Sequence, residues 1–367
     1  MKKIAMLGVG YVGLVSGTGL ADFGNEVICY DIDTTKIEKL NNGEMPIYEP
    51  GLIDLVRKNV AKGRLKFSDD LTLAIRESEV IFLAVPTPSG ENGEVDLSYI
   101  FNAVDQIAKV IDSFKVIVTK STVEVGTNDQ IRERLLSHKI APEMFEVVSN
   151  PEFLREGSAV SDFMRPDRVV IGTSSPKALE IMKEIYRPLY LIETPIVATD
   201  IHTAEMIKYA SNAFLATKIS FINEIANLCE LVGADVQQVA KAMGLDGRIG
   251  KKFLHAGPGY GGSCFPKDTL ALTKIAEKAG MRATIVEAVI EVNNRQKLRV
   301  VEKLLKVLPN LSDKTIGILG LAFKPNTNDV RETPALTVIE EILKRGGQIK
   351  AYDPEAMKEM RKYYPQI

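Results

Sequence analysis

The sequence predicts an α/β protein whose first part is a doubly wound parallel sheet. Helix-like stretches alternate with strand-like apolar runs, which read KIAMLGV, EVICYD, VIFLAVP, KVIVTKS and FEVVSNP. This alternation is typical of a parallel sheet with helices on both faces. The runs are continuously apolar, as burial on both faces requires. A further strand pair, RVVIGT and PIVATD, is expected to complete a first domain over residues 1–200.

A central, all-helical domain is predicted over residues 201–305. Neither proline nor glycine occurs from Ile201 to Val232, and apolar residues recur at helical spacing at Met206, Phe214, Ile222, Ile225 and Leu228. A helix of this length is unusual in a globular protein. We therefore expect it to link domains or to form the seam of a homodimer. Gly233 marks its end, and further helices are expected from DVQQVAKAMGL to Leu305.

The strand-and-turn pattern returns at Lys314. The run KTIGILGLAF is expected to be a strand that enters a turn, and QIKAYDP is expected to be a second strand. Both are typical of another doubly wound domain, over residues 306–367. Such a domain normally has several more strands, so we expect this one to be incomplete at Ile367.

The composition limits the classes of function. Hydrophobic residues make up 45% of the chain, charged residues 26%, and the net charge is −2. These values are ordinary for a soluble globular protein, and no basic field is present to bind nucleic acid or an anionic membrane. The apolar N-terminus has the features of a signal peptide, but its regularly spaced glycines favour a different role. No run approaches the ~20 apolar residues of a membrane span.

The cysteines and histidines argue against a disulfide framework and against a metal site. The cysteines are three in number and form no CxxC, and the histidines show no ligand spacing. We expect no metal, and a reducing cytoplasm fits this cysteine usage. The residues concerned are Cys29, Cys229, Cys264, His138, His202 and His255.

The glycine motif GVGYVG predicts a dinucleotide site. It places Gly8, Gly10 and Gly13 directly after a strand, and Asp31 ends the second strand about 20 residues later. The three glycines permit a tight turn, approach of a pyrophosphate to the backbone, and close packing of helix on strand. A carboxylate at Asp31 can accept bonds from ribose hydroxyls and repels a 2′-phosphate, which favours NAD over NADP. The alternative interpretation is a glycine-rich turn that binds nothing.

The loop GPGYGGSCFPKD singles out Cys264 as a candidate nucleophile. Four glycines of the loop precede this thiol, which is unlike a core environment and permits close approach of a ligand. Pro266 suits the first turn of a helix, so Cys264 is expected at a helix N-terminus with Lys267 nearby. Both features favour the thiolate. The alternative is a buried structural cysteine, which is our interpretation of Cys29 and Cys229.

Several polar residues are weaker candidates. Lys208 and Asn212 lie four residues apart on one face of the long helix, and Glu152 and Glu156 have the same spacing. On spacing alone, a solvated helical face is the favoured explanation of both pairs. Thr87 in VPTP and Thr122 in KSTV follow predicted strands, and ligands bind at the carboxyl ends of the strands in a doubly wound sheet.

Together, these motifs resemble the UDP-glucose/GDP-mannose dehydrogenase family. GVGYVGL, VPTP, KSTV, NPEFLREG, KYASNAF, GPGYGGSCFPKD and FKPNTNDVRETPA occur in order along the chain, and the resemblance covers essentially all of it. Members acting on UDP-N-acetylhexosamines tend to have a GGHCIPVD-like loop, and those acting on GDP-mannose tend to have leucine after the cysteine. Phe265 and FMRPDRVVIG resemble the UDP-glucose branch.

The resemblance implies roles for the matching positions. Cys264 is the implied nucleophile, with Lys208, Asn212 and Asp268 as its catalytic neighbours and Thr122 and Glu152 placing water. The implied NAD contacts are Gly8, Gly10, Tyr11, Val12, Gly13, Asp31, Lys36, Thr87, Thr122, Lys267 and Arg331. The implied substrate contacts are Glu152, Phe153, Leu154, Arg155, Glu156, Lys208, Asn212, Phe253, Leu254, Gly257, Gly261 and Lys324, with Arg248 reaching the substrate of a partner subunit.

The implied activity is an NAD-dependent four-electron oxidation of UDP-glucose to UDP-glucuronate through a Cys264 thioester, which would supply surface polysaccharide precursors. GDP-mannose as the substrate is one alternative. A simple two-electron NAD dehydrogenase is a second, and it has no use for Cys264. A third is a non-catalytic NAD-binding or dimerisation module. The number of NADH formed per sugar nucleotide separates the second from the first.

Overall fold

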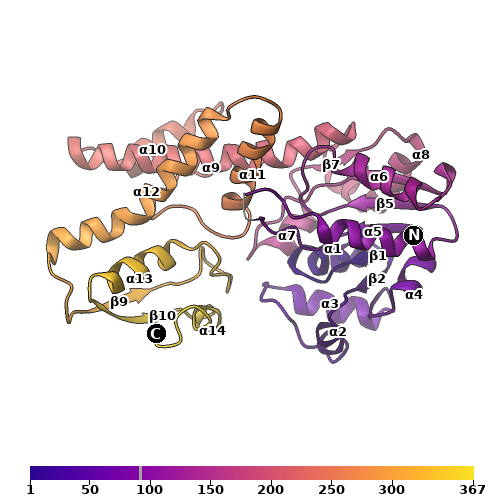
Figure 1. Ribbon diagram of the computed structural model, residues 1–367, viewed down its shortest axis with the longest axis horizontal. Helices are drawn as coiled ribbons and strands as arrows, with labels where there is room; N and C mark the ends of the chain where they lie inside the picture. The colour runs from indigo at the N-terminus through magenta and orange to yellow at the C-terminus, as the bar shows by residue number, and fades with distance from the viewer. Residues whose placement is uncertain (91–92) are drawn as a thin grey trace. The chain divides into compact units, whose positions relative to one another are not determined.

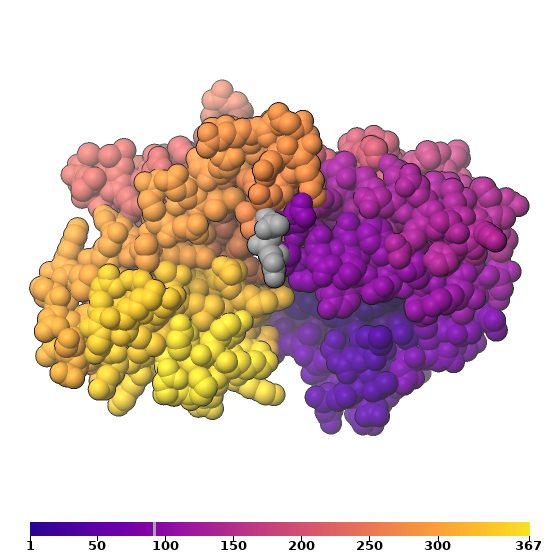
Figure 2. Space-filling view, viewed as in Figure 1, coloured from indigo at the N-terminus to yellow at the C-terminus, as the bar shows by residue number. Residues whose placement is uncertain are grey.

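The computed structural model describes residues 1–90 and 93–367. The chain forms two compact units, Met1–Lys208 and Tyr209–Ile367, which are described separately below (Figure 1). The first unit runs from indigo into magenta, and the second ends in yellow (Figure 2). None of the helices in the described residues is long and apolar enough to cross a membrane.

The first unit is built on an eight-stranded sheet with the order β3-β2-β1-β4-β5-β6-β7-β8. The strand order reverses beside β1, which lies between β2 and β4; this is the switch point at which such sheets bind ligands. The seven expected strands are present. The strands are β1 Lys3–Leu7, β2 Glu26–Tyr30, β3 Leu65–Ser68, β4 Val80–Leu83, β5 Lys115–Thr119, β6 Phe145–Ser149, β7 Val169–Gly172 and β8 Ile196–Thr199.

Two features of this sheet differ from the expectation. Strand β3 was not predicted, because it is an edge strand of four residues that alternates buried and exposed positions. Strand β7 pairs antiparallel with β6, through Ser149 and Gly172, so the sheet is not wholly parallel. The connection over residues 150–168 contains only the short helix α7, Ala159–Met164. The chain therefore returns into the sheet without the helical crossover that a parallel neighbour needs.

Helices cover both faces of the sheet, as the continuous apolar strands require. In β1, Ile4 and Met6 pack on one face and Ala5 and Leu7 on the other, and all four are buried. The first face holds α1 Tyr11–Asp22, α2 Thr34–Asn41, α3 Leu52–Ala61, α7 and α8 Pro176–Ile185. The second face holds α4 Leu71–Arg76, α5 Ser98–Val110 and α6 Thr127–Ser137. Short 3-10 helices span Pro142–Met144 and Arg187–Ile192.

The long helix α9 spans Ile201–Val232, which are the predicted bounds. It is uninterrupted because no glycine or proline occurs within it. Gly233 follows with φ +74°, a conformation that ends a helix at little cost for glycine. The first two turns of α9 belong to the first unit and the remainder to the second.

The second unit is helical at first and then returns to α/β structure. After α9 come α10 Val236–Leu245, α11 Phe265–Lys278 and α12 Thr284–Val307. Strands β9, Thr315–Leu319, and β10, Gln348–Tyr352, pair in parallel as predicted. Helix α13, Pro334–Lys344, and α14, Met357–Met360, complete this region. A small core supports it, formed by Leu321, Val330, Ile339, Ala356 and Met360.

Candidate active site

The glycine turn after β1 cannot accommodate side chains at two of its positions. A Cβ at Gly8 would lie 2.6 Å from the carbonyl oxygen of Ala84, and Gly8 has φ +101°. A Cβ at Gly13 would lie 1.8 Å from the carbonyl oxygen of Gly8. A Cβ at Gly10, in contrast, would meet nothing within 4 Å. The turn is therefore packed tightly against β4 but open at Gly10, where α1 begins with no side-chain cap on its N–H groups.

Asp31 lies at the end of β2 and braces this turn. The Val9 N–H donates to Asp31 Oδ2 at 2.8 Å, and the Asp33 N–H donates to Oδ1 at 3.0 Å. The ammonium of Lys36 lies 3.8 Å from Oδ2. Although Asp31 is largely buried, each of its oxygens has lone pairs beyond these bonds. The carboxylate can thus accept ribose hydroxyls next to the uncapped N-terminus of α1.

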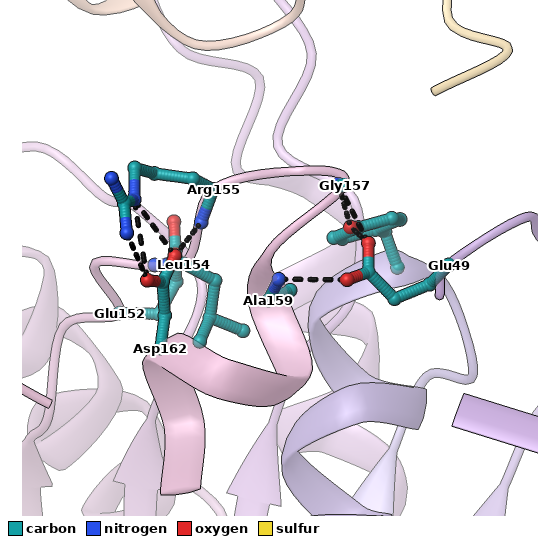
Figure 3. A network of polar contacts seen from close by, with 8 residues as sticks. Glu49, Glu152, Leu154, Arg155, Gly157, Ala159 and Asp162 are labelled. Carbon is teal, nitrogen blue, oxygen red and sulfur yellow. Dashed lines mark hydrogen bonds and ion pairs between the residues drawn. The ribbon is translucent and has the colours of Figure 1, made fainter. Parts of the chain in front are cut away.

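A buried carboxylate that was not predicted connects the glycine turn to the NPEFLREG loop. Glu49 accepts from the N–H groups of Gly157 at 2.7 Å and Ala159 at 2.8 Å (Figure 3). The Tyr11 hydroxyl also hydrogen-bonds Glu49, and it accepts from Gly157 N–H at 3.0 Å. Burial and the Glu49 charge raise the pKa of Tyr11 above its ordinary value. The Tyr11 side chain is therefore a neutral donor that fixes the loop.

Glu152 and Lys208 form a buried ion pair. The Lys208 ammonium donates to Glu152 Oε1 and to the Glu152 carbonyl, both at 2.7 Å. The Leu154 N–H donates to Oε2 at 2.6 Å. Burial acts to raise the pKa of Glu152, but the charge and hydrogen bonds of Lys208 outweigh it and the pKa is lowered. Glu152 is thus held as a carboxylate.

The rest of the NPEFLREG loop is arranged differently from a helix. Residues 150–155 have no helical structure, so Glu152 and Glu156 do not share a helical face, and that interpretation was wrong. Arg155 is exposed and pairs with Asp162, its Nε lying 3.0 Å from Oδ2 (Figure 3). The Phe153 ring carries the Arg168 guanidinium 3.5 Å above its centroid. Leu154 and Glu156 are half-buried.

The two threonines lie in loops at the carboxyl ends of adjacent strands. Thr87 follows β4 and Thr122 follows β5, and both are half-buried. Between β5 and Thr122 lies Lys120, a buried lysine that was not predicted as a site residue. Its ammonium donates to Asn150 Oδ1 at 3.1 Å. The switch-point edge of the sheet therefore brings together the glycine turn, Asp31, both threonines and the Glu152–Lys208 pair.

In the second unit, Cys264 is the N-cap residue of α11, one position before the helix start at Phe265. It is half-buried, its Sγ lies 3.6 Å from Ser263 Oγ, and its carbonyl accepts from Asp268 N–H at 2.8 Å. Cys29 and Cys229 are buried, as expected for structural cysteines. Only Cys264 thus combines partial exposure with a helix N-terminus, where a thiolate is stabilised.

A buried carboxylate follows Cys264 on α11. The Asn212 amide of α9 donates to Asp268 Oδ2 at 2.6 Å. The Lys267 ammonium lies 2.8 Å from Asp268 Oδ1 and forms an ion pair with it, but the angles of this contact are not those of a hydrogen bond. Asp268 is 1% exposed and Asn212 is 7% exposed. Lys208 and Asn212 are therefore both buried, which excludes a solvated helical face for this pair.

The glycine-rich loop before Cys264 is held by amide side chains. The Asn223 Oδ1 accepts from Gly257 N–H at 2.7 Å, and Gln296 donates to the Gly257 carbonyl at 2.8 Å. Asn293 accepts from Tyr260 N–H at 2.8 Å and donates back at 3.1 Å. A Cβ at Gly261 would lie 2.3 Å from the Glu332 carbonyl oxygen, so glycine is required there.

The remaining predicted residues of the second unit have varied surroundings. Arg248 is exposed and pairs with Asp246, and Arg331 is exposed and pairs with Asp329. The Lys324 ammonium lies 5.1 Å from the centroid of the Phe323 ring. Phe253 is half-buried with φ +64°, and Leu254 is buried. No cluster of three or more His, Cys, Asp or Glu side chains suited to a metal occurs in the described part of the chain.

The tight glycine turn at the switch point, followed by the Asp31 carboxylate after β2, is the arrangement of a dinucleotide-binding domain. Sequence comparison is more specific. The chain belongs to the UDP-glucose/GDP-mannose dehydrogenase family. Its NAD binding domain, central domain and UDP binding domain match residues 2–190, 202–295 and 317–367.

Relatives named UDP-glucose 6-dehydrogenase match nearly the whole chain. It is 55% identical to the UDP-glucose 6-dehydrogenase TuaD of Bacillus subtilis (strain 168), over 98% of this chain and 77% of the relative. It is 54% identical to the UDP-glucose 6-dehydrogenase of Rhizobium meliloti (strain 1021), over 98% of this chain and 83% of the relative. The structure of a UDP-glucose dehydrogenase from Pyrobaculum islandicum is also similar, with a TM-score of 0.96 and 40% sequence identity. The match covers 100% of this chain and 85% of that chain.

Proposed function

We propose that this chain catalyses the NAD-dependent four-electron oxidation of UDP-glucose to UDP-glucuronate. The observation that carries this proposal is Cys264, a half-buried thiol at the N-terminus of α11, four residues before the buried Asp268. The UDP-glucose 6-dehydrogenases that resemble the chain at 54–55% identity support the choice of substrate.

NAD fits the glycine turn. The space at Gly10, the uncapped N-terminus of α1 and the spare lone pairs of Asp31 suit a pyrophosphate followed by a ribose diol. When bound, NAD supplies the hydride acceptor for both oxidations. The residues that we propose to hold it are Gly8, Gly10, Tyr11, Val12, Gly13, Asp31, Lys36, Thr87, Thr122, Lys267 and Arg331.

The thiol of Cys264 explains how one carbon can lose two hydrides. After the first loss, C6 of the sugar is an aldehyde, and a trigonal aldehyde carbon is a poor hydride donor. The Cys264 thiolate adds to it and forms a tetrahedral thiohemiacetal. Loss of the second hydride leaves a thioester on Cys264. Water then cleaves the C–S bond, which releases the carboxylate and restores the thiol.

The buried polar groups have distinct roles in this scheme. Lys208 and Asn212 donate to the substrate oxygen on which charge develops, and removing one such donor costs about 3–4 kcal/mol of barrier. Glu152, held as a carboxylate, and Asp268 are the two candidates for the base that activates water; Thr122 helps to place that water.

The remaining predicted residues bind the UDP-sugar. We assign this role to Glu152, Phe153, Leu154, Arg155, Glu156, Lys208, Asn212, Phe253, Leu254, Gly257, Gly261 and Lys324. We assign the exposed Arg248 to the substrate of a partner subunit. The match of residues 317–367 to a UDP binding domain supports the third domain of the proposed division into residues 1–200, 201–305 and 306–367.

We further propose a homodimer that forms through α9. Phe214, Phe221 and Leu228 are 66%, 47% and 52% exposed and follow one another at seven-residue spacing, which places them on one face of the helix. Leu231 and Val232 extend this apolar surface. A contiguous apolar face of this kind favours a protein partner over water. The product would enter surface polysaccharide synthesis, and the enzyme would act in the cytoplasm.

The stoichiometry of the reaction tests this function. With limiting UDP-glucose, two NADH per sugar nucleotide are expected, whereas a simple alcohol dehydrogenase forms one. GDP-mannose provides the control for the substrate, and turnover with it at equal kcat/KM would contradict the assignment to UDP-glucose. One NADH per sugar would contradict the role of Cys264.

A further inference from the structure

Lys120 is a buried cation in the interior of the first unit, directly after β5. It is 6% exposed, and its ammonium donates to the uncharged Asn150 side chain at 3.1 Å. A buried ammonium without a carboxylate in direct contact costs stability, so folds rarely retain one for packing alone. Lys120 therefore calls for an explanation in terms of its neighbours.

The contacts of Lys120 lead to Glu152. Asn150 Oδ1 accepts from Lys120 and also from the Tyr186 hydroxyl, at 2.7 Å. The Asn150 amide donates to the Val170 carbonyl at 2.7 Å, so Asn150 is held on both sides. Glu152 lies only two residues further along the chain. Lys120 thus fixes the start of the loop from which the Glu152 carboxylate projects.

The charges point to the same partner. Glu152 and Lys208 are the ionisable groups whose charges act on Lys120, and the nearby Tyr186 is neutral because burial raises its pKa. Burial lowers the pKa of Lys120 to about 8, and the charge of Glu152 opposes this. Lys120 in turn adds to the lowering of the Glu152 pKa by Lys208. Below about pH 8, the ammonium groups of Lys120 and Lys208 therefore both stabilise the buried Glu152 carboxylate.

We propose that Lys120 is a positioning residue for the reaction, whose ammonium keeps the Glu152 carboxylate ionised and oriented in its pair with Lys208. This inference rests on the proposed role of Glu152. It accounts for a buried ammonium that donates to an uncharged amide. It also predicts that the effect of Lys120 depends on its charge and only weakly on its shape.

The test compares Lys120→Met with Lys120→Arg and with a matched control, Lys115→Met. Lys115 is also a buried lysine, at the start of β5, but it donates to the carbonyls of Ser78 and Arg76 at 2.5 and 3.3 Å. The pH profile of kcat and the melting temperature are measured for each variant. The acid limb of Lys120→Met should move up by about one pH unit, because an opposite charge nearby has been lost. Its melting temperature at pH 7 should not fall, and Lys120→Arg should restore the profile.

The control separates positioning from packing. Lys115→Met should lower the melting temperature and leave the acid limb in place. An unshifted acid limb in folded Lys120→Met would overturn the inference, as would loss of folding in that variant. The titration of the Glu152 carboxyl by NMR, in chain labelled with ¹³C-glutamate, does not need turnover. If the wild type is inactive, the proposed function fails, while an upward shift of the Glu152 titration in Lys120→Met still supports the role of Lys120.

Discussion

Replacing Glu49 by alanine should destabilise the first unit more than any comparable loss of a surface carboxylate. Glu49 is 7% exposed and accepts from the N–H groups of Gly157 and Ala159 at 2.7 and 2.8 Å. Hydrogen bonds to a charged group contribute about 1.5–3 kcal/mol each, so the loss of both gives about 3–6 kcal/mol. The Tyr11 hydroxyl still accepts from Gly157 in the variant, which favours the lower half of this range.

Urea unfolding followed by circular dichroism measures this loss, because the chain has no tryptophan for fluorescence. Glu79→Ala is the matched control: Glu79 is 53% exposed, pairs with Lys2 at 3.3 Å and should cost less than about 1 kcal/mol. Amide exchange at Gly157 and Ala159 should accelerate in Glu49→Ala alone. Equal stability of the two variants would refute the reasoning that Glu49 holds the loop.

Three further perturbations have defined outcomes. Gly8→Ala should abolish NAD binding, because the new Cβ would meet the Ala84 carbonyl. Gly24 also has a positive φ, +97°, but open space around it, so Gly24→Ala should cost only about 1–2 kcal/mol of stability and leave NAD binding intact. Calorimetry of each variant with and without NAD measures both effects. The pKa of Glu152 is lowered on folding, so the stability that this carboxylate contributes is fully present above the ordinary glutamate pKa of ~4.3 and is lost as the pH falls through the folded pKa. Glu152→Gln should therefore flatten the acid side of a plot of unfolding free energy against pH, and an unchanged plot would count against this reasoning. Phe221→Asp should shift the sedimentation coefficient from dimer to monomer, and an unaltered value would exclude this face of α9.

The parts of the fold that depend on local patterns could be predicted from the sequence. The bounds of α9 follow from the absence of glycine and proline between Ile201 and Val232. The place of Cys264 before α11 follows from Pro266, and the start differs by one residue. Strand β3 escaped prediction because a four-residue edge strand has too few residues to show a period. The antiparallel β7 escaped because strand direction depends on the path of the connecting chain and leaves no mark in the strand itself.

The supporting residues of the candidate site could not be predicted, because their partners are distant in sequence. Glu49 and Gly157 are 108 residues apart, and Lys120 and Asn150 are 30 apart. Glu205, on α9, accepts from the N–H groups of Gly126 and Asn128 at 2.7 and 3.0 Å. It thereby anchors the helix one turn before Lys208. In the sequence, a buried carboxylate of this kind cannot be distinguished from a surface carboxylate, because the N–H groups that donate to it come from distant parts of the chain.

The central claim is that the substrate becomes covalently bound to Cys264, and acid-quenched mass spectrometry tests it most directly. The chain is mixed with UDP-glucose and NAD, quenched within a turnover and digested. The account predicts a sugar-nucleotide adduct on the peptide that contains Cys264, which hydroxylamine removes and which Cys264→Ala lacks. Formation of UDP-glucuronate by Cys264→Ala at the wild-type rate, with no adduct at any time in the wild type, would contradict it.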